Sequence, residues 1–537
     1  MKLSQALLYA TVLWPFAPVP RLMSQVQQEV SSVPTFRSTS SLVFLDVTVL
    51  DKMGRPIVTG LTKDDFTITE EKQAQRIFSF EAPQAHVMGM NAGDANPEGK
   101  APVTIFVLDL LNSSFEDFAF IRYSVRKYLA AEPARLRSPV EMLVIGNESL
   151  ETLQGYTRSK TDLLFALNHL PPALPYKKMN GAFFAERFGQ SIDALQQIAL
   201  QNKGVPGRKN VIWVGHGGPG MNTSFLTGPI VEDIDRYVHE TTNLLVDARI
   251  SLFVIYPGLK VRGTNFSISA MDADADIGNG DDDPFAGEVN FGVFVNETGG
   301  NLFYNRNDVG KEINRCQQLG SEYYTLTYQP QGVLPDGKFR RIRVTLRNPN
   351  LRAITKAGYF APYESAPVDP RQQVIINVAE AARSTIPFDA LGLKVSGVVR
   401  HPDTRTVEFT VVLNSKDLDW KETGEGKSTA GLTLIAASLT GARDILASKI
   451  EKVTLWSDMQ DPTLRSNVMT GFLLTVRVPM RTQRVRVVME TNEGGRIGAA
   501  DLDRKTIDAA PAMTTPEPQL DSRRPEEDRP TTPMANF

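Results

Sequence analysis

The sequence has little cysteine and histidine, with one cysteine and five histidines among 537 residues. A single cysteine excludes an intrachain disulfide. Cys316 shares one helical face with Val309, Ile313 and Leu319, which predicts a buried thiol rather than a reactive one. There is no Cys-x-x-Cys pair and no His-Glu-x-x-His motif, so these common zinc signatures are excluded.

The sequence also lacks a large excess of charge of one sign and long apolar runs. The formal net charge is −3, and lysine and arginine are dispersed rather than gathered in a stripe with aromatic residues. This pattern argues against a nucleic-acid partner. Beyond the N-terminus no apolar run is long enough for a membrane helix, so we expect none in the mature chain. A hydrophobic content of 42% instead predicts a globular protein, and 537 residues correspond to about two to four domains.

The N-terminus is typical of an exported protein. Lys2 precedes an apolar run from Ala6 to Val19, which is too short to span a bilayer and suits a secretory signal. We therefore expect residues 1–25 to be a signal peptide, and the protein to reach the periplasm, the cell surface or the medium. The alternative is a disordered or buried N-terminal segment.

Two separated stretches predict one small β module. Residues 38–86 contain short strand-like runs separated by turns, with Gly54 at a position suited to positive φ. Residues 321–362 contain similar runs. We expect the two stretches to pair and to flank the part of the chain between them.

Residues 101–320 alternate between strand-like and helical patterns. Near-continuous apolar runs such as 103–109 and 251–256 are typical of strands buried on both faces. Between them, apolar residues recur at helical spacing. This alternation predicts an α/β fold, a Rossmann-like and mostly parallel sheet covered by helices, with residues 150–156 as an antiparallel edge strand.

The C-terminal third reads differently. Proline-containing residues 363–380 are expected to be a linker. Residues 385–503 contain about seven strand-like runs without helical periods, which predicts an immunoglobulin-like β sandwich. Residues 504–537 are rich in proline and charge, and we expect them to be disordered.

The main candidate site follows the first α/β strand. Asp109 ends this strand, and Asn112 and Ser113 lie in the polar turn after it. Ser114, with Asp117 three residues later, is close to a capping box that starts a helix. Open α/β folds bind ligands at such a strand end.

Several local stretches, in this order, resemble one family. They lie in residues 46–80, 109–117, 210–215, 297–303 and 323–338. Together they resemble the VWFA-related domain family of acidobacterial type, a von Willebrand factor A-like (VWA) family, over roughly residues 40–362. The resemblance implies a VWA fold, export, and a role in protein binding or adhesion.

The resemblance also implies a metal-ion-dependent site. In ligand-binding VWA domains a divalent cation sits on an Asp-x-Ser-x-Ser loop, a threonine and a later aspartate. Here Asp109 and Ser113 match the loop and Leu111 does not, the later aspartate falls near His216, and the threonine has no clear counterpart. We expect a degenerate site for Mg²⁺ or another divalent cation, with Asn112 and His216 as further possible ligands. The alternative is a metal-free scaffold in which these are turn and cap residues.

A second candidate cation site is the acidic loop 258–287. Its alternating aspartates, in a glycine-rich context, could wrap Ca²⁺ with oxygen ligands. The spacing is not that of an EF-hand, because Ile277 stands where a glycine is needed, and a solvated acidic loop is the alternative. The candidate ligands are Asp272, Asp274, Asp276 and Asp283.

No enzyme motif is complete. The text from His216 to Gly220 resembles the glycine-rich oxyanion segment of α/β hydrolases, but no Gly-x-Ser-x-Gly motif occurs. A dinucleotide-binding site would require a helix that begins at the third glycine of this segment. The sequence does not indicate a helix there, so we expect a plain glycine-rich turn. His86 and His169 have no partner pattern and are expected at the surface. We predict no catalytic residue, with a hydrolase as a distant alternative.

Two functions remain open from the sequence. The first is an exported protein that binds a protein partner or mediates adhesion through the edge that carries Asp109. The second is a structural component of a cell-envelope complex that needs no metal.

Overall fold

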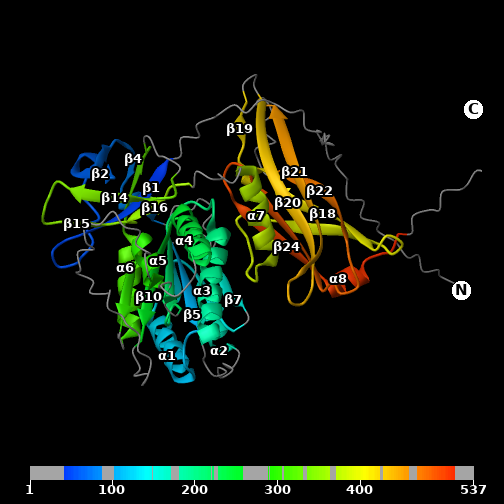
Figure 1. Ribbon diagram of the computed structural model, residues 1–537, viewed down its shortest axis with the longest axis horizontal. Coiled ribbons are helices and arrows are strands. Elements are labelled where there is room, and N and C mark those ends of the chain that lie inside the picture. The colour runs from blue at the N-terminus through cyan, green and yellow to red at the C-terminus, as the bar shows by residue number, and fades with distance from the viewer. Residues whose placement is uncertain are drawn as a thin grey trace, which may run out of the picture.

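The computed structural model describes most of the chain between residues 42 and 513 (Figure 1). Among these residues no helix is long and apolar enough to cross a membrane. The acidic loop 258–287 lies outside the described residues, as do the expected signal peptide and residues 514–537. The described ranges are 42–87, 102–147, 149–170, 181–218, 221–222, 228–257, 288–289, 291–304, 308–330, 336–362, 370–423, 427–458 and 468–513.

A six-stranded sheet forms the centre of the α/β part, in the order β12-β10-β8-β5-β6-β7. Neighbouring strands are parallel except β6 and β7, which are antiparallel, as the sequence predicts for the edge. The mixed α/β architecture is therefore confirmed. The strands are β5 (Val103–Asp109), β6 (Arg135–Ile145), β7 (Leu150–Ser159), β8 (Lys209–Val214), β10 (Ile250–Tyr256) and β12 (Asn301–Tyr304).

Helices cover both faces of this sheet because successive strand residues point to opposite sides. Along β5, Ile105 and Val107 pack toward α3, α4 and α5, whereas Phe106 and Leu108 pack toward α1, α2 and α6. Cys316, on α6, is fully buried in the second cluster, as predicted. The helices are α1 (Phe115–Ala131), α2 (Lys160–Asn168), α3 (Gly181–Asn202), α4 (Gly228–Asp247), α5 (Phe291–Glu297) and α6 (Val309–Ser321), and a two-stranded sheet joins β9 (Met221–Asn222) and β11 (Glu288–Val289).

The two stretches assigned to the small β module pair with one another. They form two four-stranded sheets, β15-β1-β13-β4 and β16-β14-β2-β3, around a core that includes Leu45, Phe66 and Leu326. Gly54 has the positive φ, 76°, that its turn requires. The strands are β1 (Val43–Leu50), β2 (Phe66–Glu70), β3 (Gln73–Gln75), β4 (Ile77–Glu81), β13 (Tyr324–Tyr328), β14 (Phe339–Leu346), β15 (Arg352–Ile354) and β16 (Gly358–Phe360).

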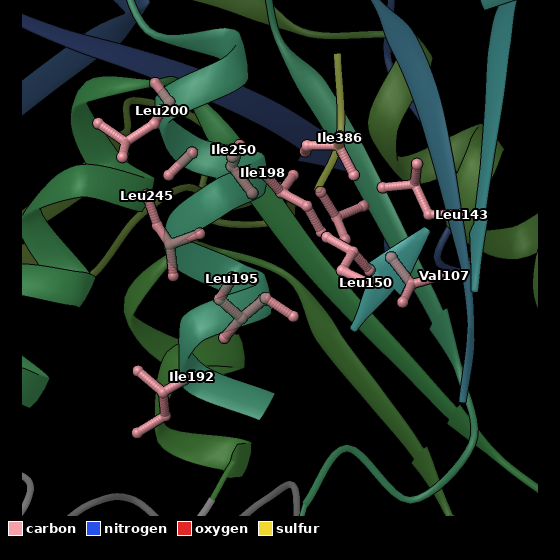
Figure 2. Close-up of a cluster of buried hydrophobic side chains, with 14 of the residues drawn as sticks. Val107, Leu143, Leu150, Ile192, Leu195, Ile198, Leu200, Leu245, Ile250 and Ile386 are labelled. Carbon is pink, nitrogen blue, oxygen red and sulfur yellow. The ribbon is translucent and has the colours of Figure 1, made fainter. Parts of the chain in front are cut away.

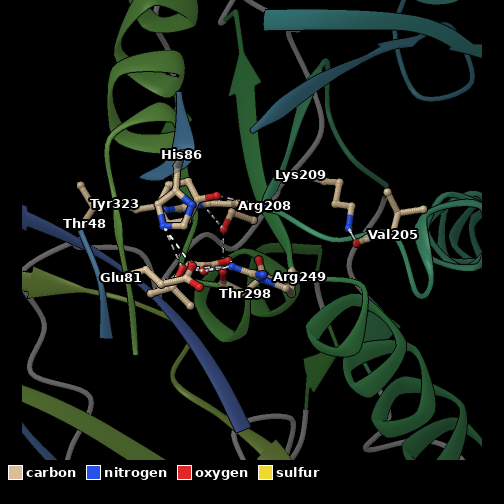
Figure 3. Close-up of polar contacts among 12 residues, drawn as sticks. Thr48, Glu81, His86, Val205, Arg208, Lys209, Arg249, Thr298 and Tyr323 are labelled. Atoms are coloured by element: carbon tan, nitrogen blue, oxygen red, sulfur yellow. Dashed lines mark hydrogen bonds and ion pairs between the residues drawn. The ribbon is translucent and has the colours of Figure 1, made fainter. Parts of the chain in front are cut away.

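Buried and partly buried charged side chains join this module to the amino-terminal edge of the central sheet (Figure 3). Arg249, just before β10, donates to the carboxylate of Asp46 on β1. Arg208, just before β8, donates to the hydroxyls of Thr48 on β1 and Ser251 on β10, each at 3.0 Å. Burial acts to raise the pKa of Asp46, but the charge and hydrogen bonds of Arg249, the charge of Arg208 and a hydrogen bond from Thr325 together hold that pKa below its usual value. The module therefore lies at the edge opposite Asp109.

His86 belongs to the same junction, so its expected place at the surface is wrong. Its side chain is 6% exposed and stacks on Tyr323, with 4.3 Å between ring centroids. Its Nε2 lies 3.2 Å from the hydroxyl of Thr325. These partners come from the second half of the module, which is distant in sequence, so the residues around His86 gave no local signal for them. His169 is exposed, as expected.

The C-terminal part is built from antiparallel strands in two sheets. One has the order β17-β18-β22, and the other joins β19, β20, β23 and β24, with β21 paired to β20. The strand content agrees with the sequence, but an immunoglobulin-like sandwich is not confirmed. The strands are β17 (Lys394–His401), β18 (Thr406–Asn414), β19 (Lys421–Glu422), β20 (Lys427–Leu439), β21 (Ile445–Asp458), β22 (Met469–Arg477), β23 (Arg484–Thr491) and β24 (Ile497–Asp503).

Two sequence-based boundaries are wrong. Residues Pro370–Arg383, most of them in the expected linker 363–380, form helix α7, with the proline at its first position, where the missing N–H costs nothing. Arg504–Ala509, in the expected disordered tail 504–537, form helix α8, which Asp503 caps by accepting a hydrogen bond from the backbone of Thr506. In both stretches the proline and charge content of the surrounding sequence led us to expect no helix.

The C-terminal part shares one hydrophobic cluster with the α/β part. Val378 of α7, Ile386 and Val488 of β23 belong to the same cluster as Leu195 of α3 and Val107 of β5. Figure 2 shows Ile386 beside Leu150 and Leu143. The side chain of Gln197, on α3, also accepts hydrogen bonds from Ser384 and Thr385. Burial of this apolar surface fixes the two parts against each other.

A buried acid lies at this junction. Glu141, on β6, is 1% exposed and accepts a hydrogen bond of 3.0 Å from Gln201, which also donates to the carbonyl of Pro387. Burial raises the pKa of Glu141 to about 7, and the nearby charge of Asp389 adds to this, while hydrogen bonds from Gln201 and Tyr156 oppose it.

We predict that Glu141→Gln stabilises the protein above neutral pH. The pKa of Glu141 is higher in the folded chain than in the unfolded chain. The contribution of this group to the free energy of unfolding is therefore fully present below about pH 4 and is lost as the pH rises through about 7. The neutral amide avoids this loss, so the free energy of unfolding should rise by about 2–3 kcal/mol at pH 8 and be nearly unchanged at pH 4. Urea unfolding at both pH values measures this.

The matched control is Glu151→Gln, at an exposed position on neighbouring β7. It should leave the unfolding midpoint unchanged at both pH values. Equal effects of the two substitutions at pH 8 would contradict a buried, destabilising charge at Glu141.

Candidate functional site

The candidate site lies where the chain order of the central sheet reverses. The chain passes from β5 to β6 on one side, and later to β8 on the other side of β5. In open α/β sheets the crevice at the carboxyl ends of such strands is where ligands bind. Asp109 is the last residue of β5, and His216 follows β8 by two residues. The structure thus brings together residues that the sequence analysis selected separately.

The carboxylate of Asp109 is the centre of the site. The residue is 0% exposed, and four N–H groups donate to its two oxygens. Oδ1 accepts from the backbone N–H of Asn112 at 2.8 Å, and Oδ2 accepts from Trp213 Nε1 and the backbone N–H of Gly217, each at 2.9 Å. The side-chain Nδ2 of Asn112 lies 3.2 Å from both oxygens. A buried carboxylate needs such donors to offset its lost hydration.

Asn112 connects this carboxylate to helix α3. Its Nδ2 also donates to the hydroxyl of Ser191 at 3.0 Å, and Ser191 donates to the backbone carbonyl of Arg187 at 2.8 Å. Because a carboxylate oxygen only accepts, the amide nitrogen must face Asp109 and the amide oxygen must face away. That oxygen, and the hydroxyl of Ser113, are buried without a hydrogen-bond partner among the described residues.

A glycine turn brings β8 close to Asp109. Gly215 has φ 145°, and a Cβ there would lie 2.3 Å from the Cβ of Asp109. Gly217 has φ 79°, and a Cβ there would lie 2.4 Å from the ring of Phe291. The N–H of Gly217 donates to Asp109, so this donor is already used and does not point at an oxyanion or phosphate site.

Aromatic rings and further charges surround the turn. The ring of His216 lies 3.9 Å from that of Tyr256, which in turn stacks on Tyr304 at 5.0 Å. Burial lowers the pKa of His216, with the charge of Arg187 adding to this and those of Asp109 and Asp117 opposing it. The imidazole is therefore uncharged at neutral pH.

Ser114 serves as the cap of α1, as the sequence predicts. Its hydroxyl accepts from the backbone N–H of Asp117 at 3.1 Å and donates to the carboxylate of Asp117 at 2.9 Å. Asp117 is 3% exposed, so its charge lies buried at the start of the helix, where the helix dipole favours it.

The side chains present do not fit a magnesium ion. Leu111, where the Asp-x-Ser-x-Ser pattern needs a serine, is 0% exposed and packs in the hydrophobic cluster of the α3 face. The oxygens of Asp109 already accept N–H donors, and the neutral ring of His216 is a poor ligand for a cation that prefers oxygen. No group of three or more His, Cys, Asp or Glu side chains suited to a metal occurs in the described ranges. The alternative ligands Asp272, Asp274, Asp276 and Asp283 lie outside those ranges.

Sequence reasoning missed the residues that complete the site. Trp213 lies within an apolar strand, and Arg187 and Ser191 lie within helix α3, so none of the three stands out in the sequence. The single usable signal is the i, i+4 spacing of Arg187 and Ser191, which puts two polar side chains on one face of α3.

Comparisons with known proteins add little. No family model and no curated protein matches this chain. Among solved structures, the SpRpn10 VWA domain is matched at 13% sequence identity and a TM-score of 0.23, over 41% of this chain and 96% of that domain. Proximal thread matrix protein 1 of the mussel byssus is matched at 12% identity and a TM-score of 0.20, over 29% of this chain and 38% of that protein. Likenesses at such TM-scores establish neither a fold family nor a function.

We predict that Gly215→Ala disrupts the site. A methyl group would meet Asp109 and would hold an L-residue at a positive φ, so the free energy of unfolding should fall by about 2–4 kcal/mol. The control is Gly189→Ala within α3, where a Cβ meets nothing within 4 Å. This change should stabilise the protein by about 0.5–1 kcal/mol, because alanine favours a helix. Urea unfolding measures both, and a loss for Gly215→Ala no larger than about 0.5 kcal/mol would contradict the close approach.

Proposed function

We propose that this chain is an exported VWA-type protein that binds a protein partner at the carboxyl edge of its central sheet. The VWA assignment is supported by the local sequence resemblance together with the mostly parallel, helix-covered sheet. The place of the site is supported by the reversal of strand order between β5 and β8. Among the described residues, the β module lies at the opposite edge of the sheet.

The observation that carries the proposal is the presence of two exposed aromatic residues, Phe115 and Tyr304, on elements that begin or end at this edge of the sheet. Phe115, the first residue of α1, is 62% exposed, and Tyr304, at the end of β12, is 38% exposed. Tyr304 stacks on Tyr256, so its ring is held in place before a partner arrives. Rigid aromatic side chains are enriched among the residues that contribute most to binding at protein interfaces.

We predict that Phe115→Ala and Tyr304→Ala each weaken capture of the partner at least about tenfold, as loss of an interface anchor does. The bait is the purified full chain, immobilised and exposed to a cell-envelope fraction, and the retained protein is quantified. Tyr123→Ala is the control, because Tyr123 is 61% exposed on the same helix but about 12 Å farther along its axis. Equal capture by all four proteins would contradict this edge as the binding surface.

Export is the second part of the proposal, and it is supported by Lys2 and the apolar run that follows it. We predict that the full chain, expressed in a bacterial host, is recovered outside the cytoplasm. Deletion of residues 1–25 should retain it inside. Cell fractionation followed by immunoblotting measures this, and identical distributions of the two forms would refute a signal peptide.

A further inference from the structure

The amide of Asn112 occupies a bridging position in the site. Its Nδ2 is 3.2 Å from each oxygen of Asp109 and 3.0 Å from the hydroxyl of Ser191. One positively polarised group thus joins a carboxylate at a strand end to a hydroxyl from another segment. In a metal-dependent site at such an edge, the bound cation makes this connection.

The carboxylate has little capacity left for a cation. Two oxygens offer about four lone-pair positions. Oδ1 accepts from the backbone and side chain of Asn112, while Oδ2 accepts from the same amide, Trp213 and Gly217. An incoming ion would have to break several of these bonds in a site that is 0% exposed at Asp109.

We propose that the Asn112 amide takes the place of a divalent cation, so that the carboxyl edge is organised, and engages its partner, without a metal ion. Metal-free binding of the partner rests on the function proposed above. The organisation of the edge does not rest on it, because it follows from the hydrogen bonds among Asp109, Asn112, Trp213 and Ser191.

The substitution Asn112→Asp tests the proposal because it keeps the shape of the side chain. It places a second carboxylate about 3 Å from that of Asp109, where two like charges repel. The hydroxyl of Ser191 would lie beside both acids, which gives oxygen ligands suited to Mg²⁺ or Mn²⁺. The variant should therefore acquire the cation dependence that the natural sequence lacks.

The indole of Trp213 provides a local readout, since its Nε1 lies 2.9 Å from Asp109. The chain contains four tryptophans, so the full chain can be labelled with fluorotryptophan and the Trp213 signal assigned with Trp213→Phe. Mn²⁺ bound at Asp109 broadens that ¹⁹F signal. We expect no site-specific broadening in the natural chain up to about 1 mM Mn²⁺, the weak end of functional cation sites. We expect selective broadening in Asn112→Asp.

Thermal unfolding supplies the second measurement. Asn112→Asp should have a lower melting temperature in EDTA, with Mn²⁺ restoring it, whereas the natural chain should melt at the same temperature in both buffers. Asn168→Asp, at an exposed position on α2, adds the same charge and should show no cation response. If Asn112→Asp does not fold in EDTA, recovery of folded protein on refolding with Mn²⁺ replaces the melting curve, and no recovery counts against the proposal.

Two outcomes overturn the proposal. One is selective broadening of the Trp213 signal in the natural chain that Asp109→Asn abolishes. The other is an Asn112→Asp variant with no gain in cation affinity. Partner capture by the natural chain, repeated with EDTA, separates the two proposals: capture lost only in EDTA overturns the metal-free site, whereas no capture in either buffer counts against the proposed function alone.

Discussion

The buried carboxylate of Asp109 is the constraint on which the carboxyl edge depends. A charge with no exposure to water is stable only when donors surround it, and here they come from three parts of the chain. The loop after β5 supplies Asn112, strand β8 supplies Trp213, and the turn after β8 supplies Gly217. Loss of this one anion would remove the reason for the close approach of the glycine turn to β5.

The β module and the C-terminal part both attach elsewhere on the central sheet. The β module attaches at the opposite edge, where Asp46 meets Arg249 and Arg208 bonds Thr48. The C-terminal part attaches beside α3 and β7, through the cluster that contains Ile386 and Leu150 (Figure 2). A polar junction at one end and an apolar junction at the side therefore hold the three parts of the described chain together, and neither junction lies at the edge that carries Asp109.

Much of the fold could be predicted, because the information is local. The apolar run 103–109 and the period that includes Phe118 and Ile121 specify β5 and α1 within a few residues. The predictions failed where composition conflicted with packing. The 370–383 stretch begins with proline, yet α7 forms because its apolar side meets β20, β23 and α3. His86 looked like a surface residue, yet Tyr323 covers it.

By itself the sequence determined that an acid ends the first α/β strand, that Ser114 caps the next helix, and that glycines follow β8. These features depend on neighbours along the chain. Only the tertiary structure decided that this acid meets N–H donors rather than open water. Its partner Trp213 lies 104 positions away in sequence, and Ser191, the partner of Asn112, lies 79 positions from Asn112. The order of strands in the sheet brings them together, because parallel strands joined by crossovers align their carboxyl ends regardless of separation along the chain.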